Sequence, residues 1–175
     1  MKRLISLFVI ATITVASLCF TSSCGYKVTY NLSGGSIPPA AQTFSVAYFP
    51  NNAPMVAPIL SATMTDELTQ RFATRTALTQ VEEGGDFAFE GEIVGYTSNT
   101  SSVSSGDYAL QNRLTITVKV KFTNAIDDKM SFNRNFSAYA DYDSTKLLTE
   151  VESELIPQIV EQLVTDIFQA AASNW

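Results

Sequence analysis

The stretch "RLTITVKVKF", from Arg113 to Phe122, constrains the fold of this chain more than any other segment. Apolar and polar side chains alternate along it without a break. Because successive side chains of a β-strand point to opposite faces, this pattern builds one apolar face and one polar face. The apolar positions are Leu114, Ile116, Val118, Val120 and Phe122. The stretch is therefore predicted to be a strand at the centre of a sheet, with one face covered by another layer.

Two further stretches alternate in the same way and are predicted strands: "TFSVAYFP" (43–50) and "DFAFEGEIVGYT" (86–97). In the second, one face is expected to carry Phe87, Phe89, Gly91, Ile93 and Gly95, with Glu90, Glu92 and Tyr96 on the other. Antiparallel pairing with the 113–122 strand would place the two glutamates near Thr117 and Lys119. Such pairs are favourable across neighbouring strands.

A fourth strand is predicted in "SFNRNFSAYA" (131–140), where one side is shared by Phe132, Arg134, Phe136 and Ala138. Arg134 is out of place between two phenylalanines on a face that should be apolar. A β-bulge near Asn133 would turn its side chain outward, and a bulge is the expected solution.

Two stretches have helical periodicity instead. Leu60, Met64, Leu68 and Phe72 recur every fourth residue and predict an amphipathic helix over 56–74. The last stretch, 144–175, carries apolar residues at three- and four-residue spacing, with Ser144 as the expected N-cap. Pro157 lies inside it, so a kink or a break is expected near residues 153–155.

The element order is strand, helix, three strands, helix. It predicts an α+β fold, a two-layer α/β sandwich with two helices packed on one face of a four-stranded mixed sheet. The other face of the sheet would be left partly open to solvent or to a partner.

The N-terminus has the features of a lipoprotein signal. Lys2 and Arg3 precede a moderately apolar run, and small residues lead to Cys24. We therefore expect a signal peptide over 1–23, lipid attachment at Cys24, a lipidated arm over 24–42 and the sandwich domain over 43–175. The alternative is an ordinary secreted protein with an incidental thiol. Two acyl chains already anchor a protein stably, so the lipid would hold the protein to a membrane that it does not span.

Composition excludes several function classes. The chain has 11 basic and 17 acidic residues and a net charge of −6, which argues against nucleic acid as a partner. It has no histidine, and Cys24 would be the only cysteine left after processing. Imidazole-based zinc sites, serine–histidine–aspartate triads and thiol catalysis are therefore excluded. No metal, no cofactor and no enzymatic activity are expected.

A resemblance to a known family rests on several segments together. "CGYKV" at the mature start, "MTDELTQRFATRTAL", "DFAFEGEIVGYT", "QNRLTITVKVKF" and the ending "VEQLVTDIFQAAASNW" resemble LptE, the outer-membrane lipoprotein that assists lipopolysaccharide assembly. The resemblance covers nearly the whole mature chain. It implies a non-enzymatic α/β sandwich that plugs a large β-barrel translocon, helps the barrel to assemble and contacts lipopolysaccharide. It also implies an outer-membrane location on the periplasmic side.

Lipopolysaccharide combines anionic groups with acyl chains, so its site should offer cations beside hydroxyl or apolar surface. Arg113, Lys119 and Lys121 lie on one face of the predicted central strand, and Lys129 follows in the next turn. These four residues are the candidate lipopolysaccharide-binding residues. The alternative is a solvated strand face whose cations pair with Glu90 and Glu92.

Two other functions remain open at this point. One is an accessory lipoprotein of a different lipid-transport or envelope complex, with the same anchor and sandwich but no barrel. The other is a lipid-anchored enzyme, which the missing histidine and cysteine disfavour because its chemistry would depend on carboxylates alone.

Overall fold

The computed structural model describes residues 37–55, 57–101 and 111–172. The chain divides into two units, Met1–Leu32 and Ser33–Trp175, and the described residues belong to the second. The predicted signal peptide and Cys24 lie outside the described residues, as does most of the predicted arm.

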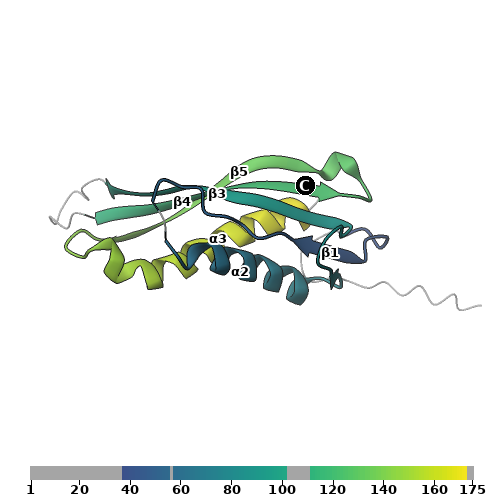
Figure 1. Cartoon of the computed structure of the whole chain (residues 1–175), viewed down its shortest axis with the longest axis horizontal. Helices are drawn as coiled ribbons and strands as arrows, with labels where there is room; N and C mark the ends of the chain where they lie inside the picture. Colours follow the sequence, from purple (N-terminus) through teal and green to yellow (C-terminus); the bar gives the residue numbers. More distant parts are fainter. Residues whose placement is uncertain (1–36, 56, 102–110, 173–175) are drawn as a thin grey trace, which may run out of the picture. The chain divides into compact units, whose positions relative to one another are not determined.

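The described chain forms one mixed sheet and two α-helices (Figure 1). The strands are β1 (Thr43–Val46), β2 (Thr79–Gln80), β3 (Phe87–Ser101), β4 (Gln111–Asn124) and β5 (Phe132–Asp143), in the spatial order β2-β1-β3-β4-β5. The helices are α2 (Leu60–Arg75) and α3 (Leu148–Ala172), and the 3₁₀ turn η1 (Asp128–Met130) links β4 to β5. β1 pairs in parallel with β2 and β3, whereas β3, β4 and β5 form an antiparallel meander.

The predicted α+β fold is confirmed, but the count of four strands is wrong. The fifth strand, β2, is two residues long and both of its side chains are exposed. A segment so short shows no alternation, so periodicity gives no signal for it. β1 is also shorter than predicted. After Val46 the chain continues beside β3 as an irregular segment, in which the Phe49 N–H donates to the Thr65 hydroxyl of α2 at 3.2 Å.

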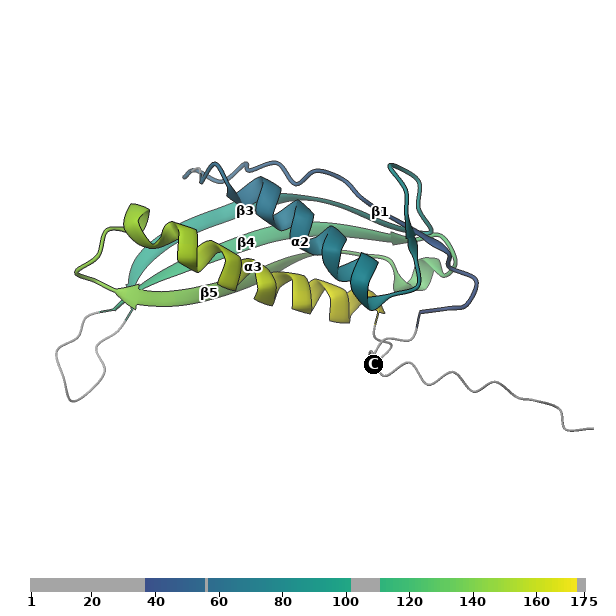
Figure 2. The same cartoon turned by 90° about the horizontal axis from the view of Figure 1, so that it is seen from below.

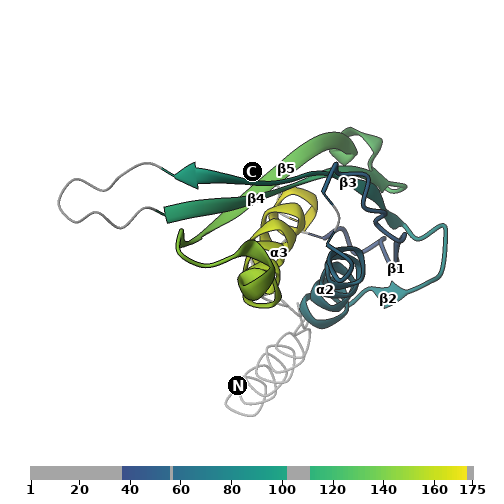
Figure 3. The same cartoon turned by 60° about the vertical axis from the view of Figure 1, so that its left-hand side comes forward.

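Both helices cover the same face of the sheet, as predicted (Figures 2 and 3). All five apolar side chains of the alternating stretch in β4 are at most 1% exposed. The four-residue stripe of α2 and the broader stripe of α3 are buried in the same hydrophobic core. The prediction of a helix over 56–74 places its start four residues too early. Pro58 disfavours helical backbone in the residue before it, and α2 begins only at Leu60.

A β-bulge in β3 changes which side chains reach the core. Ile93 pairs with Val118 but Gly95 pairs with Thr117, so Val94 is an extra residue. The placement predicted for Gly95 and Tyr96 is therefore wrong. Tyr96 is 1% exposed and its hydroxyl donates to Glu152 of α3 at 2.6 Å. Burial, followed by the hydrogen bond to Glu152, raises the pKa of the Tyr96 phenol.

The bulge expected near Asn133 does not occur. The β4–β5 pairing runs without a shift through Lys121–Asn133 and Val120–Arg134. Arg134 therefore stays on the face that the helices cover. It is exposed because β5 is the edge strand, and its guanidinium carbon lies 4.8 Å from the ring centre of Phe132 and 4.7 Å from that of Phe136.

The start of α3 differs from the prediction. Ser144 is not the N-cap, because β5 continues to Asp143 and the Asp143 carboxylate accepts the N–H of Thr145 at 2.8 Å. The helix begins at Leu148, and the Leu147 N–H donates to the Glu150 carboxylate at 3.1 Å. This bond is half of a capping box.

A kink or a break was expected near residues 153–155. The helix does not break there, because α3 is continuous from Leu148 to Ala172. Proline removes one hydrogen bond and crowds the carbonyl four residues earlier, here that of Ser153. Ser153 and Pro157 are both exposed, so the affected backbone faces solvent. Ile156 and Ile159, on the opposite side, are fully buried and hold the helix against the sheet.

Gly91 is required by a close contact in the core. A Cβ atom added there would overlap the ring of Phe49, which is fully buried, and the backbone carbonyl of Lys119. We expect Gly91→Ala to lower the free energy of unfolding by about 1–3 kcal/mol, the usual cost of overpacking. Urea denaturation measures it. In a Phe49→Leu background the same substitution should cost less, and equal costs in both backgrounds would contradict the contact.

Asp86 joins the start of β3 to the start of β1. Its Oδ2 accepts the N–H of Gln42 at 2.8 Å and both the N–H and hydroxyl of Thr43 at 3.0 Å. These bonds, led by that from Gln42, hold the pKa of the carboxyl below its ordinary value of 3.8. The folded protein therefore releases this proton more readily than the unfolded chain does.

This linkage predicts a pH dependence of stability. The stabilisation by Asp86 is complete above the pKa of the unfolded chain and is lost as pH falls through the lower pKa of the folded state. Asp86→Asn should be less stable than the wild type near neutral pH, and the difference should narrow below about pH 4. Urea denaturation across this range measures it. A difference that stays constant with pH would contradict the role of the ionised carboxylate.

Candidate functional site

The uncovered face of the sheet carries a ladder of charged and hydroxyl side chains. Alternation in β4 places Arg113, Thr115, Thr117, Lys119 and Lys121 on this face, opposite the buried row. Glu90 of β3 lies opposite Lys121, and Glu92 lies opposite Lys119. The predicted partnership of Glu92 with Lys119 is confirmed. Thr117, the other predicted partner of the glutamates, instead pairs with Gly95, and Glu90 lies opposite Lys121. Periodicity alone does not reveal this register.

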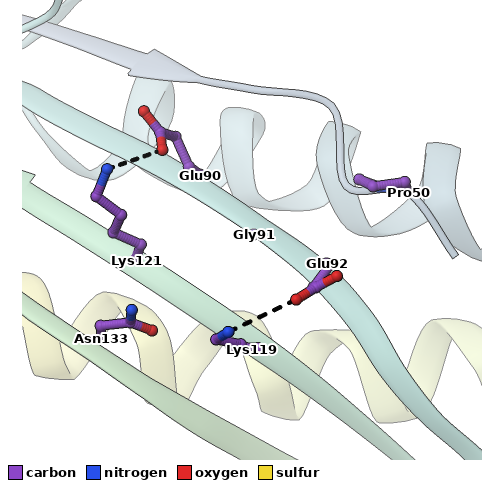
Figure 4. Close-up of a pocket in the computed structure, with 7 residues that line it drawn as sticks. All are labelled: Pro50, Glu90, Gly91, Glu92, Lys119, Lys121 and Asn133. Atoms are coloured by element: carbon purple, nitrogen blue, oxygen red, sulfur yellow. Dashed lines mark hydrogen bonds and ion pairs between the residues drawn. The ribbon is translucent and has the colours of Figure 1, made fainter. Parts of the chain in front are cut away.

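One end of this face is hollowed by a shallow depression of about 320 Å³. It is lined by Pro50, Glu90, Gly91, Glu92, Lys119, Lys121 and Asn133 (Figure 4). The lining comes from β3, β4 and β5 and from the segment that follows β1. Two of the candidate lysines therefore share one concave site.

Each lysine of the depression already has an acidic partner. The Lys121 ammonium lies 3.1 Å from a Glu90 carboxylate oxygen, and Lys119 lies 3.7 Å from Glu92 (Figure 4). Glu92 also accepts a hydrogen bond from the Asn52 side-chain amide at 2.8 Å. The Lys121–Glu90 side chains are 54% and 60% exposed, so this pair is weakly held and water competes for it.

Arg113 lies on the same face but nearer the other end of β4. Its guanidinium donates to both carboxylate oxygens of Asp141, at 2.7 and 2.9 Å, and lies 3.7 Å from the ring centre of Tyr139. The hydrogen bond to Asp141 raises the pKa of Arg113, and the bond from Arg113 lowers the pKa of Asp141. This arginine is held more firmly than the lysines, because bidentate geometry and stacking act together.

The four predicted residues do not form one cluster. Lys119 and Lys121 are neighbours on the strand face, whereas Arg113 is six residues from Lys119, on the order of 20 Å along a strand. Lys129 lies in η1, in the connection between β4 and β5. Among the described residues no carboxylate lies within 4.0 Å of the Lys129 ammonium.

The pairing also agrees with the alternative of a solvated, self-neutralised face. Three cations meet three carboxylates there, and the middle of the face is occupied by a 2.8 Å hydrogen bond between the hydroxyls of Thr117 and Ser137. An anionic ligand would have to displace the carboxylates from the lysines.

Sequence reasoning missed three residues of the site. Asn133 lines the depression because β5 has no bulge, so plain alternation would have placed it correctly. Pro50 and Asn52 come from an irregular segment whose backbone bonds to β3, with the Asn52 N–H donating to the Ile93 carbonyl at 2.9 Å. No periodic signal marks such a segment.

The described part of the chain shows neither a metal-binding cluster nor a membrane-spanning helix. No group of three or more aspartate, glutamate or cysteine side chains lies close enough there to hold a metal ion. None of the helices described combines the length and the apolar composition that crossing a membrane requires.

Residues 41–171 match the family of lipopolysaccharide-assembly proteins called LptE. The chain belongs to the LptE family. The resemblance noted from the sequence is therefore confirmed. The family is described by its part in lipopolysaccharide assembly. No curated protein sequence matches the chain.

Solved structures with little sequence identity share the fold. A hypothetical protein from Chlamydia trachomatis aligns with a TM-score of 0.51 at 9% identity, over 77% of this chain and 100% of that one. A protein from Xanthomonas campestris aligns with a TM-score of 0.50 at 14% identity, over 76% and 87%. At these identities the likeness concerns the fold alone.

The exposed ion pairs predict that the site lysines contribute little to stability. Lys119→Gln and Lys121→Gln should each change the free energy of unfolding by less than about 1 kcal/mol. Val120→Ala, at the residue between them but facing the core, should cost about 2 kcal/mol or more. Urea denaturation compares the three variants. A lysine variant as unstable as Val120→Ala would show that its ion pair is structural.

Proposed function

We propose that this protein is a lipid-anchored component of the lipopolysaccharide assembly machinery of the outer membrane, facing the periplasm. In this proposal the protein plugs a β-barrel translocon and assists its assembly. Lipopolysaccharide binds on the open sheet face through Arg113, Lys119, Lys121 and Lys129. The protein catalyses no reaction. Cys24 carries the lipid that holds it to the membrane.

The observation that carries the proposal is a polar, cation-bearing sheet face in a member of the LptE family. Phosphate and carboxylate groups of an acidic lipid require ammonium or guanidinium donors. Lys119 and Lys121 offer such donors side by side in an open depression, with their partners in weak, exposed pairs. A multiply charged phosphate competes well for an ammonium held in this way.

The plug role draws on the same face for a different reason. The interior wall of a membrane barrel is polar. A sheet face made of balanced ion pairs and hydroxyls matches such a wall without burying unpaired charge. The two helices pack on the other face, where their apolar side chains form the core.

Binding of purified lipopolysaccharide to the detergent-solubilised full chain tests the site. Lys119→Gln combined with Lys121→Gln should raise the Kd roughly tenfold or more, as expected for the loss of charge-assisted hydrogen bonds. Glu90→Gln combined with Glu92→Gln should lower the Kd, because it frees the same lysines. Isothermal titration calorimetry measures both changes.

Arg71→Gln combined with Arg75→Gln is the matched control. It removes the same charge from α2, in the other layer of the sandwich, and should leave the Kd unchanged. If the control and the lysine variant raised the Kd equally, the effect would be one of net charge, and the proposed binding site would be contradicted.

Affinity purification from detergent-solubilised envelopes tests the barrel. A large β-barrel recovered in stoichiometric amount supports the plug role. Recovery of inner-membrane transport subunits instead would favour the alternative function, an accessory lipoprotein of another lipid-transport or envelope complex.

A further inference from the structure

Within the part of the chain that the structure describes, nothing pairs with the outer edge of β5. β5 is the last strand in the sheet order and pairs only with β4. Within the described residues, no backbone group of residues 132–142 hydrogen bonds to anything beyond that pairing. Of the usual protections of an edge strand, β5 has neither a proline nor a bulge, and its one inward-pointing charge is Arg134.

The pattern of backbone hydrogen bonds identifies which residues face outward. The Ile93 N–H donates to the Pro50 carbonyl and the Ile93 carbonyl accepts from Asn52, so both groups point away from β4. In an antiparallel ladder, residues that pair without bonding to each other alternate with residues that exchange both bonds. Val118, opposite Ile93, therefore directs its backbone groups to β5 and bonds with Phe136.

Alternation then extends this assignment along β5. Even-numbered residues bond to β4, and odd-numbered residues present their N–H and C=O to the open edge. The outward residues are Asn133, Asn135, Ser137, Tyr139 and Asp141. Asp143 follows the same rule, because its carbonyl accepts the N–H of Lys146 from outside the sheet.

Arg134 gives this edge a charge preference. Its guanidinium lies over two phenyl rings, which fix its position. Among the described residues it has no carboxylate within 4.0 Å, unlike Arg113, Lys119 and Lys121. Arginine set among aromatic rings is the kind of residue that contributes most at protein interfaces.

We propose that the β5 edge accepts an extended strand of a different protein, which places a carboxylate opposite Arg134. The backbone of the added strand bonds to the outward groups of β5, as in β-strand addition. When the added strand runs antiparallel to β5, the residue opposite Arg134 occupies a position without direct backbone bonds, where side chains approach most closely. An aspartate or glutamate at that position would form an ion pair with Arg134, the only cationic residue of β5.

A second copy of this chain fits the edge less well. Two copies of β5 pairing antiparallel about a two-fold axis bring together residues that share a face. The residues on the face of Arg134 are Phe132, Phe136, Ala138, Ala140 and Tyr142, and none is acidic. Self-pairing would therefore leave Arg134 without a carboxylate opposite it.

Photo-crosslinking from the edge of the full chain in cell envelopes tests the proposal. The photoreactive residue p-benzoylphenylalanine replaces Asn135 in one variant and Tyr139 in another, both exposed and outward-facing. An added strand should yield crosslinks to one protein, at two positions about four residues apart, mapped by mass spectrometry.

Asn135→Pro, combined with the crosslinker at position 139, tests the backbone bonds. Proline removes an N–H that faces outward and leaves the bonds to β4 intact, so the domain should keep its thermal stability. The crosslink yield should fall about tenfold, because the added strand loses roughly one backbone hydrogen bond and some of its contact with β5. Asn135→Ala keeps the N–H and should keep the yield.

Arg134→Glu tests the charge. It should reduce crosslinking, and a lysine at the mapped acidic residue of the partner should restore it. Several results would overturn the proposal: crosslinks to a second copy, to residues 1–36 of the same chain or to lipid, or crosslinks at unrelated positions. Equal yields from the proline and alanine variants would overturn it as well.

Discussion

The rest of the structure depends on the two-faced character of β4. Its five apolar side chains are almost completely buried, and each contributes about 1.5–3 kcal/mol when removed from water. This row lies on one face of the sheet, so α2 and α3 must both pack there. The meander of β3, β4 and β5 keeps the neighbouring strands in the same alternation, apart from the bulge at Val94.

Covering one face of the sheet leaves the other face to balance its own charge. Lys119 and Lys121 are immediate chain neighbours of the buried Val120, so they cannot leave the surface without breaking the core. Glu90, Glu92 and Asp141 lie across from the three cations of β4 and neutralise them. The proposed site is thus a direct consequence of the burial on the opposite face.

The sequence predicts the parts of the fold that repeat along the chain and fails where one residue breaks the repeat. β4, the stripe of α2 and the shared face of Arg113, Lys119 and Lys121 all follow from periodicity. The extra residue Val94 shifts the inward and outward alternation of β3 by one position. The sequence on either side of it does not show this shift, so it does not reveal that Tyr96 points inward and bonds to Glu152. Asp141 and Asn52 join the cations through contacts distant in sequence, which depend on strand register and on an irregular segment.

The open face and the free edge of β5 are geometrically coupled. In β5 the residues whose backbone groups face the edge are also those whose side chains lie on the open face, because both properties alternate with the same period. Asn133 belongs to this set and lines the depression that holds Lys119 and Lys121. A strand added at the edge would therefore extend the open face beside Asn133 and add a wall to the depression.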